Sequence, residues 1–146
     1  MKLYFDLCAL KRPFDDRSQL RVDREAAAVL GLLETVEDRR HRMVWSIGLT
    51  FENNADPDVE VRSVVASLEV LAGEQPGLTR EVEQRIMQLV ASGLSALDSA
   101  HLAFAEAALC DALLTCDDQF LRRANGIRTS VRVLNPLQLV EELAHG

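Results

Sequence analysis

Short, continuous apolar runs alternate along this chain with longer segments in which apolar residues are spaced as on a helix. The first such run, Leu3-Tyr4-Phe5, lies almost at the start of the sequence. Runs of this kind, bounded by polar residues, are typical of strands that are buried on both faces. We therefore expect four strands, at residues 2–6, 43–45, 112–116 and 131–134.

The segments between these runs predict helices, because their apolar residues recur every three or four positions. Residues 7–17, with Arg12-Pro13 at their centre, have no such stripe and are expected to form a loop. Ser18 is the expected N-cap of the long helix that follows. The expected helices are 18–38, 46–53, a pair within 57–91 opened by Asp56-Pro57 and by Thr79, 95–109, 118–124 and a last one opened by Asn135-Pro136.

This alternation predicts the fold class. Strands that alternate with helices, and that are apolar throughout, are typical of a parallel sheet covered on both faces. We expect a three-layer αβα architecture with a central parallel sheet of four or five strands. The chain has 146 residues, about the usual size of one domain, so we expect a single domain over 1–146.

Composition and charge narrow the function classes. The net charge of −7 argues against tight nonspecific binding of nucleic acid, although a bound cation would change the local field of a nuclease. The cysteines, Cys8, Cys110 and Cys116, are odd in number and include no CxxC pair, as expected for reduced thiols in a cytoplasmic protein. Asp6 interrupts the first apolar run, so we expect no signal peptide. No run approaches the ~20 apolar residues of a membrane span.

Four acidic residues lie just after expected strands or in the helices that neighbour them in the sequence. Asp6 ends the first strand, and Asp117 directly follows the third. Glu52 lies one or two helical turns beyond the second strand, and Asp98 lies in the first turn of the helix that leads into the third. Ligands of open parallel sheets bind at the carboxyl ends of the strands. We expect Asp6, Glu52 and Asp117 to share one rim, which Asp98 joins if its helix begins there.

Carboxylates gathered in this way indicate a divalent cation. Two unit charges ~4 Å apart repel by about 4 kcal/mol at an effective dielectric of ~20, so without a cation some of the acids should hold a proton. Mg²⁺ and Mn²⁺ prefer oxygen ligands and would remove this cost. Such an ion can activate a water and polarise a phosphate, so no Ser or His nucleophile is required.

Each acid also has a purely structural interpretation. Asp98 follows Ser95 by three residues and could complete a capping box, and Asp117 could be only the N-cap of the helix at 118–124. Glu52 could be a solvated helix residue. Asp6 caps no obvious helix. Taken together, four such coincidences favour the metal site. His101, one turn after Asp98, fits a satisfied helix histidine better than a site residue.

The ordered set of segments resembles the PIN-domain family, the ribonuclease fold of many VapC-type toxins. No single segment is decisive, but together they span nearly the whole chain. The matching stretches are Leu3-Tyr4-Phe5-Asp6-Leu7-Cys8 with Arg12-Pro13-Phe14-Asp15-Asp16, Trp45-Ser46 leading to Phe51-Glu52-Asn53, Asp98-Ser99-Ala100-His101-Leu102-Ala103, Leu113-Leu114-Thr115-Cys116-Asp117-Asp118-Gln119-Phe120 and Val133-Leu134-Asn135-Pro136-Leu137.

The resemblance implies a function and a set of site residues. The family's acidic quartet maps onto Asp6, Glu52, Asp98 and Asp117, as catalytic ligands of one or two Mg²⁺ or Mn²⁺ ions. Thr115 and Asp118 are expected beside them: Thr115 would orient a carboxylate or water, and Asp118 is an alternative to Asp117. The implied activity is metal-dependent endoribonuclease, as the toxin of a type II VapBC-like pair. Expected partners are an RNA substrate, a small antitoxin and a second copy of the chain.

Two rival interpretations remain at this stage. One is a non-catalytic or housekeeping PIN-like module that binds RNA or a protein partner. The other is a phosphoacceptor receiver domain, which also gathers acids at a strand rim. A receiver normally needs a lysine at the end of a late strand, whereas both lysines here, Lys2 and Lys11, lie near the start of the chain.

Overall fold

A four-stranded parallel sheet forms the centre of the molecule in the computed structural model, which describes residues 1–146. The strands are β1 (Lys2–Phe5), β2 (Arg42–Val44), β3 (Ala112–Leu114) and β4 (Arg132–Leu134), in the spatial order β2-β1-β3-β4. All pairs are parallel, and Tyr4 lies in register with Val44 on one side and Leu113 on the other. The predicted sheet of four or five parallel strands is confirmed, with four.

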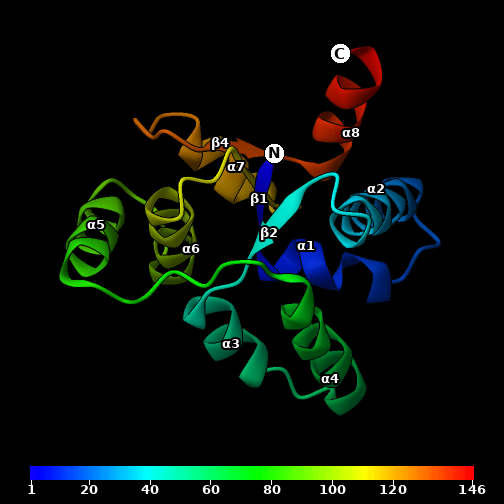
Figure 1. The fold of residues 1–146 in the computed structure, drawn as a ribbon, viewed down its shortest axis with the longest axis horizontal. Coiled ribbons are helices and arrows are strands. Elements are labelled where there is room, and N and C mark those ends of the chain that lie inside the picture. Colours follow the sequence, from blue (N-terminus) through cyan, green and yellow to red (C-terminus); the bar gives the residue numbers. More distant parts are fainter.

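Helices cover both faces of this sheet and complete a three-layer α/β fold. In Figure 1, α2 and α8 lie on one side of the sheet, and α5 and α6 lie on the other. The helices are α1 (Leu7–Lys11), η1 (Arg12–Phe14), α2 (Leu20–Glu37), α3 (Ile47–Asn54), α4 (Val59–Ser67), η2 (Leu68–Leu71), α5 (Arg80–Ala91), α6 (Ala96–Ala107), α7 (Asp118–Ala124) and α8 (Pro136–His145), where η marks a 3₁₀ helix.

The core explains why the strands are apolar throughout. Every residue from Leu3 to Phe5 and from Ala112 to Leu114 is fully buried, because each central strand packs against helices on both faces. These strands belong to one cluster of 33 buried hydrophobic residues. None of the helices is both long enough and apolar enough to cross a bilayer.

The expected loop at 7–17 is wrong, and so is the statement that Asp6 caps no helix. Helix α1 begins directly after β1, and the Asp6 side chain accepts a hydrogen bond from the Ala9 N–H at 2.9 Å as its N-cap. The 3₁₀ turn η1 follows, with Pro13 in its first turn, where its missing N–H costs nothing. A helix of five residues is too short to show an apolar stripe, so periodicity could not reveal it.

Two expected caps are displaced. Ser18 does not cap α2; the N-cap is Gln19, without a side-chain hydrogen bond. Asp56 does not cap the helix after Pro57 either. The cap of α4 is Asp58, whose own N–H is bound by Asp56 Oδ1 at 2.8 Å in a turn that precedes the helix. The expected caps Thr79, Ser95, Asp117 and Asn135 are confirmed.

Candidate functional site

The two central strands end beside each other, and their carboxyl ends carry the first part of the site. Asp6 follows β1, and Thr115 to Asp117 follow β3. Asp6 is only 4% exposed, and its backbone N–H donates to the Leu114 carbonyl at 3.0 Å, which continues the β1–β3 pairing to the rim. No lysine or arginine forms a salt bridge with Asp6.

Burial changes the proton affinity of Asp6. Loss of hydration raises the pKa of its carboxyl to about 6, and this effect outweighs hydrogen bonds from the Thr115 hydroxyl and the Ala9 N–H, which lower it. A buried carboxyl with no basic partner is costly in its charged form. Asp6 is therefore the member of the predicted quartet that would gain most from a cation.

Thr115 connects the ends of the two strands. Its fully buried hydroxyl oxygen accepts a hydrogen bond from the Asp117 N–H at 3.1 Å and lies 3.3 Å from Cys8 Sγ. The Asp117 side chain caps α7, because its Oδ1 accepts from the Gln119 N–H at 2.9 Å. The N-cap role predicted for Asp117 is thus present, and the same residue stands exposed at the rim.

Asp118 turns away from the other acids. It forms a two-point ion pair with Arg21, with one contact at 2.8 Å, and this pairing lowers the pKa of its carboxyl. Asp117 has no such partner, and its charge acts on Asp98. The structure therefore places Asp117, and not Asp118, with the other acids.

Asp98 reaches this rim from the first turn of α6. Its N–H donates to Ser95 Oγ at 3.1 Å, which is one half of the predicted capping box; no hydrogen bond from the Ser95 N–H to the Asp98 carboxylate completes it. Partial burial raises the pKa of the Asp98 carboxyl; a hydrogen bond with Ser95 opposes the shift, and the negative charges of Asp117 and Glu52 add to it. The charges of Asp117 and Glu52 therefore act together with burial to favour the protonated form of Asp98.

Glu52 comes to the rim from α3 and is held there by a buried histidine. His101 Nε2 lies 2.9 Å from Glu52 Oε1, and His101 Nδ1 lies 2.7 Å from the Tyr4 hydroxyl. The Tyr4 hydroxyl is in turn 2.6 Å from Ser46 Oγ. His101, Tyr4 and Ser46 are all buried, whereas the Glu52 side chain is 29% exposed.

Reading the sequence missed the parts that Tyr4 and Ser46 play, and it favoured a purely helical role for His101. His101 is indeed satisfied at both ring nitrogens, but one of its partners is Glu52. The available signal was the spacing: His101 follows Asp98 by three residues and therefore lies on the same face of α6. Nothing in the sequence links Ser46 with Tyr4, because they meet only through β1 and the start of α3.

The donor chemistry of these acids fits a hard divalent cation. All four offer carboxylate oxygens, and none pairs with a lysine or arginine. No group of three or more His, Cys, Asp or Glu side chains lies close enough together in the structure to hold a metal ion. Within the predicted quartet, the charges of Asp117 and Glu52 act on Asp98, whereas no acid of the quartet acts measurably on Asp6.

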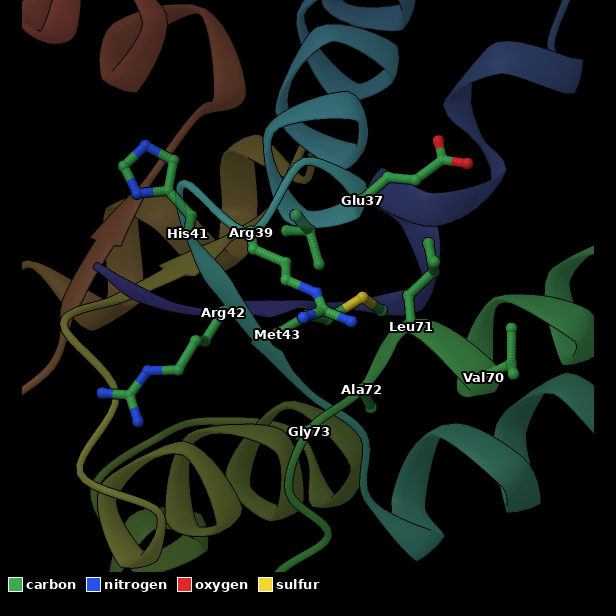
Figure 2. Close-up of a pocket in the computed structure, with 10 residues that line it drawn as sticks. Glu37, Arg39, His41, Arg42, Met43, Val70, Leu71, Ala72 and Gly73 are labelled. Carbon is green, nitrogen blue, oxygen red and sulfur yellow. The ribbon is translucent and has the colours of Figure 1, made fainter.

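The largest pocket lies elsewhere. It has a volume of about 550 Å³ and is formed by the end of α2, the approach to β2 and the segment after η2 (Figure 2). Arg42 begins β2, so this pocket is at the amino end of the sheet, opposite the rim that carries Asp6. The side chains of Arg39 and Arg42 point in different directions (Figure 2). We place the candidate chemistry at the rim that carries Asp6, because the volume of a pocket is not by itself evidence of a reactive site.

The fold and the rim define a three-layer α/β protein with unpaired carboxylates at the carboxyl ends of its two central strands. A scan against models of known protein families finds no match for this chain. A search of curated proteins finds no match either.

Proposed function

We propose that this protein is a Mg²⁺- or Mn²⁺-dependent endoribonuclease. Asp6, Glu52, Asp98 and Asp117 would hold the ion or ions. The observation that supports this most is the environment of Asp6: a buried carboxylate at the carboxyl end of a central strand, with a pKa raised to about 6 and without a lysine or arginine partner. The resemblance of the ordered segments to PIN domains supplies RNA as the substrate class.

The bound ion would supply an activated water and a positive charge opposite the phosphate. The residues of the chain prepare its place. Asp6 and Asp98 have raised pKa values and would release their protons as the ion binds. Asp117 is held by its capping bonds and by the Thr115 hydroxyl, and Glu52 is held by His101. An open rim suits a polymer better than a small molecule, which would need an enclosing pocket.

The direct test is Mn²⁺-dependent cleavage of RNA by wild type and Asp6→Asn. We expect the variant to lose about 100-fold or more in rate, the scale seen when a group that stabilises the reacting charge is removed. Asp111→Asn is the matched control, because Asp111 binds the Lys2 N–H at the opposite end of the sheet. Equal activity of wild type and Asp6→Asn would refute the nuclease.

We further propose that the protein acts as the toxin of a type II VapBC-like pair, as a homodimer whose rim is covered by a small antitoxin. Expression of wild type should then arrest growth, whereas Asp98→Asn should not. Growth arrest by both proteins would show that the arrest does not depend on RNA cleavage, and would refute the proposed toxin role.

A non-catalytic or housekeeping PIN-like module is the second candidate. The observation that favours it is the absence of a closed set of three ligands in the structure. Such a module would bind RNA or a protein partner equally well with and without Mn²⁺, whereas the nuclease requires the ion for turnover. Binding and cleavage measured on the same RNA, with and without EDTA, separate the two.

A further inference from the structure

Three hydrogen bonds, two of them buried and the third partly buried, run in series from the core to Glu52. Ser46 Oγ lies 2.6 Å from the Tyr4 hydroxyl, the hydroxyl lies 2.7 Å from His101 Nδ1, and His101 Nε2 lies 2.9 Å from Glu52 Oε1. Ser46 is the N-cap of α3 and Glu52 lies in its last turn. The series therefore joins the two ends of α3 through a strand and a second helix.

The chemistry of the groups gives the series a direction. A carboxylate can only accept hydrogen bonds, so His101 Nε2 must carry the proton that reaches Glu52. In a neutral imidazole Nδ1 is then an acceptor, and the Tyr4 hydroxyl must donate to it. The Tyr4 oxygen then accepts a hydrogen bond from the Ser46 hydroxyl. If the imidazole is doubly protonated, Nδ1 donates to the Tyr4 oxygen and the Tyr4 hydroxyl donates to Ser46. In both cases Nε2 donates to Glu52.

Packing prevents the imidazole from leaving this arrangement. His101 is 1% exposed, and its ring centroid lies 5.6 Å from that of Tyr4. On the other side, a Cβ added at Gly48 would come within 3.3 Å of Ser46 Oγ and 3.6 Å of His101 Nδ1. The turn of α3 that carries Gly48 therefore lies directly against the series, and a larger side chain there would press on the Ser46 hydroxyl.

We infer that Ser46, Tyr4 and His101 are positioning residues that fix Glu52 as a one-oxygen ligand. His101 occupies Oε1, and no group of the protein is bonded to Oε2, which is left for a cation. This inference rests on the proposed metal site and goes beyond it, since it assigns the choice of oxygen and the residues that make it. Fixing a ligand by a second hydrogen-bonded group commonly accounts for 10- to 100-fold in metal affinity.

Metal binding measured by electron paramagnetic resonance of Mn²⁺ tests the inference without relying on cleavage. His101→Leu removes the donor and should bind Mn²⁺ about 10- to 100-fold more weakly than wild type. His101→Gln keeps an N–H that can reach Glu52 and should retain most of the affinity. Tyr4→Phe, which removes only a hydroxyl, should lose about fivefold, the value of one ordinary hydrogen bond. Thr50→Val is the control, because it removes another α3 hydrogen bond, to Trp45, that does not touch Glu52.

The ¹⁵N NMR resonances of the His101 ring provide a second measurement, which needs no metal. We expect Nε2 to carry the proton in wild type, and the Nδ1 resonance to move in Tyr4→Phe and to stay in Thr50→Val. A proton on Nδ1 alone, or a folded His101→Leu that binds Mn²⁺ as tightly as wild type, would overturn the inference. If wild type binds no Mn²⁺ while the nitrogen shifts are as expected, the metal site fails and the hydrogen-bond series stands, so the two failures are distinguishable.

Discussion

His101 Nε2 lies 2.9 Å from Glu52 Oε1, and this hydrogen bond links α6 to α3. It brings an acid from a helix after the edge strand β2 towards the acids that follow the central strands β1 and β3. Without it, Glu52 would be one more partly exposed helix residue. The relationship therefore gives Glu52 a fixed place in the proposed site, although only Asp6 and Asp117 directly follow strands of the sheet.

The neighbouring acids Asp117 and Asp118 should differ sharply in function. Asp117→Asn removes a carboxylate that acts on Asp98, whereas Asp118→Asn removes the partner of Arg21 on the surface. We expect Asp117→Asn to lower Mn²⁺-dependent RNA cleavage by about 100-fold or more and Asp118→Asn to leave it nearly unchanged. Comparable losses in both variants would show that the second acid takes part.

Asp6 should make the metal-free protein less stable as pH rises. Its pKa in the folded state is raised from 3.8 to about 6, so its contribution to stability is complete below pH 3.8 and is lost as pH rises through 6. A shift of this size corresponds to about 3 kcal/mol. Urea unfolding in EDTA from pH 4 to 7 should show this fall in wild type relative to Asp6→Asn.

Addition of Mn²⁺ at pH 7 should restore the stability of wild type and leave Asp6→Asn unchanged, because the ion replaces the proton only where a carboxylate can hold it. Parallel pH profiles for wild type and Asp6→Asn would contradict the raised pKa. Restoration of the variant by Mn²⁺ would instead remove Asp6 from the ligands.

Glu25 is a buried carboxylate whose neutralisation should depend on Arg12. Glu25 is fully buried, and its Oε1 lies 3.1 Å from Arg12 Nε, a close ion pair whose atoms are not aligned as a hydrogen bond; Oε2 accepts from Asn135. Arg12→Met removes the nearer counter-ion and leaves only Arg21, whose Nε lies 3.5 Å from Oε2, so it should cost about 2–4 kcal/mol in urea unfolding.

The double variant Arg12→Met with Glu25→Gln should be more stable than Arg12→Met alone, since it also removes a buried charge that has lost its nearer partner. Arg132→Met is the control, because its pair with Glu142 is exposed and should contribute little. If the double variant is less stable than the single one, Glu25 is stabilised by groups other than Arg12.

Two glycines in helices should respond oppositely to alanine. Gly48→Ala places a Cβ 3.3 Å from Ser46 Oγ and should lower both thermal stability and Mn²⁺ affinity. Gly31 in α2 has nothing within 4 Å of the new Cβ, so Gly31→Ala should stabilise the protein by about 0.5–1 kcal/mol and leave Mn²⁺ affinity unchanged. Thermal unfolding with and without Mn²⁺ measures both, and stabilisation by both substitutions would contradict the close packing at Gly48.

Local patterns were sufficient for much of the architecture. The continuous apolar run Ala112 to Cys116 predicts a buried strand, because a strand covered on both faces has no polar face to alternate with. Thr79 and Ser95 predict helix starts, because a hydroxyl side chain satisfies free N–H groups in the first turn. The three-layer parallel fold follows from these signals in order.

Where the outcome depends on a few residues, local patterns were insufficient. Helix α1 has only one turn of sequence, so its start at Asp6 was missed. The cap of α4 is Asp58 and not Asp56, because Asp56 binds the Asp58 N–H in the turn before the helix. Both residues are aspartates, so the sequence alone does not distinguish the cap from the turn residue.

The sequence by itself determined the parallel sheet, the order of its elements and the placement of Asp6 and Asp117 after strands, because burial and capping act over a few neighbouring residues. Tertiary structure alone decided that Asp118 pairs with Arg21, that the charge of Glu52 raises the pKa of Asp98, and that Glu52 is held by His101. The physical reason is that hydrogen bonds and charge effects depend on distances in space, and these side chains meet only after strands and helices remote in the chain have packed together.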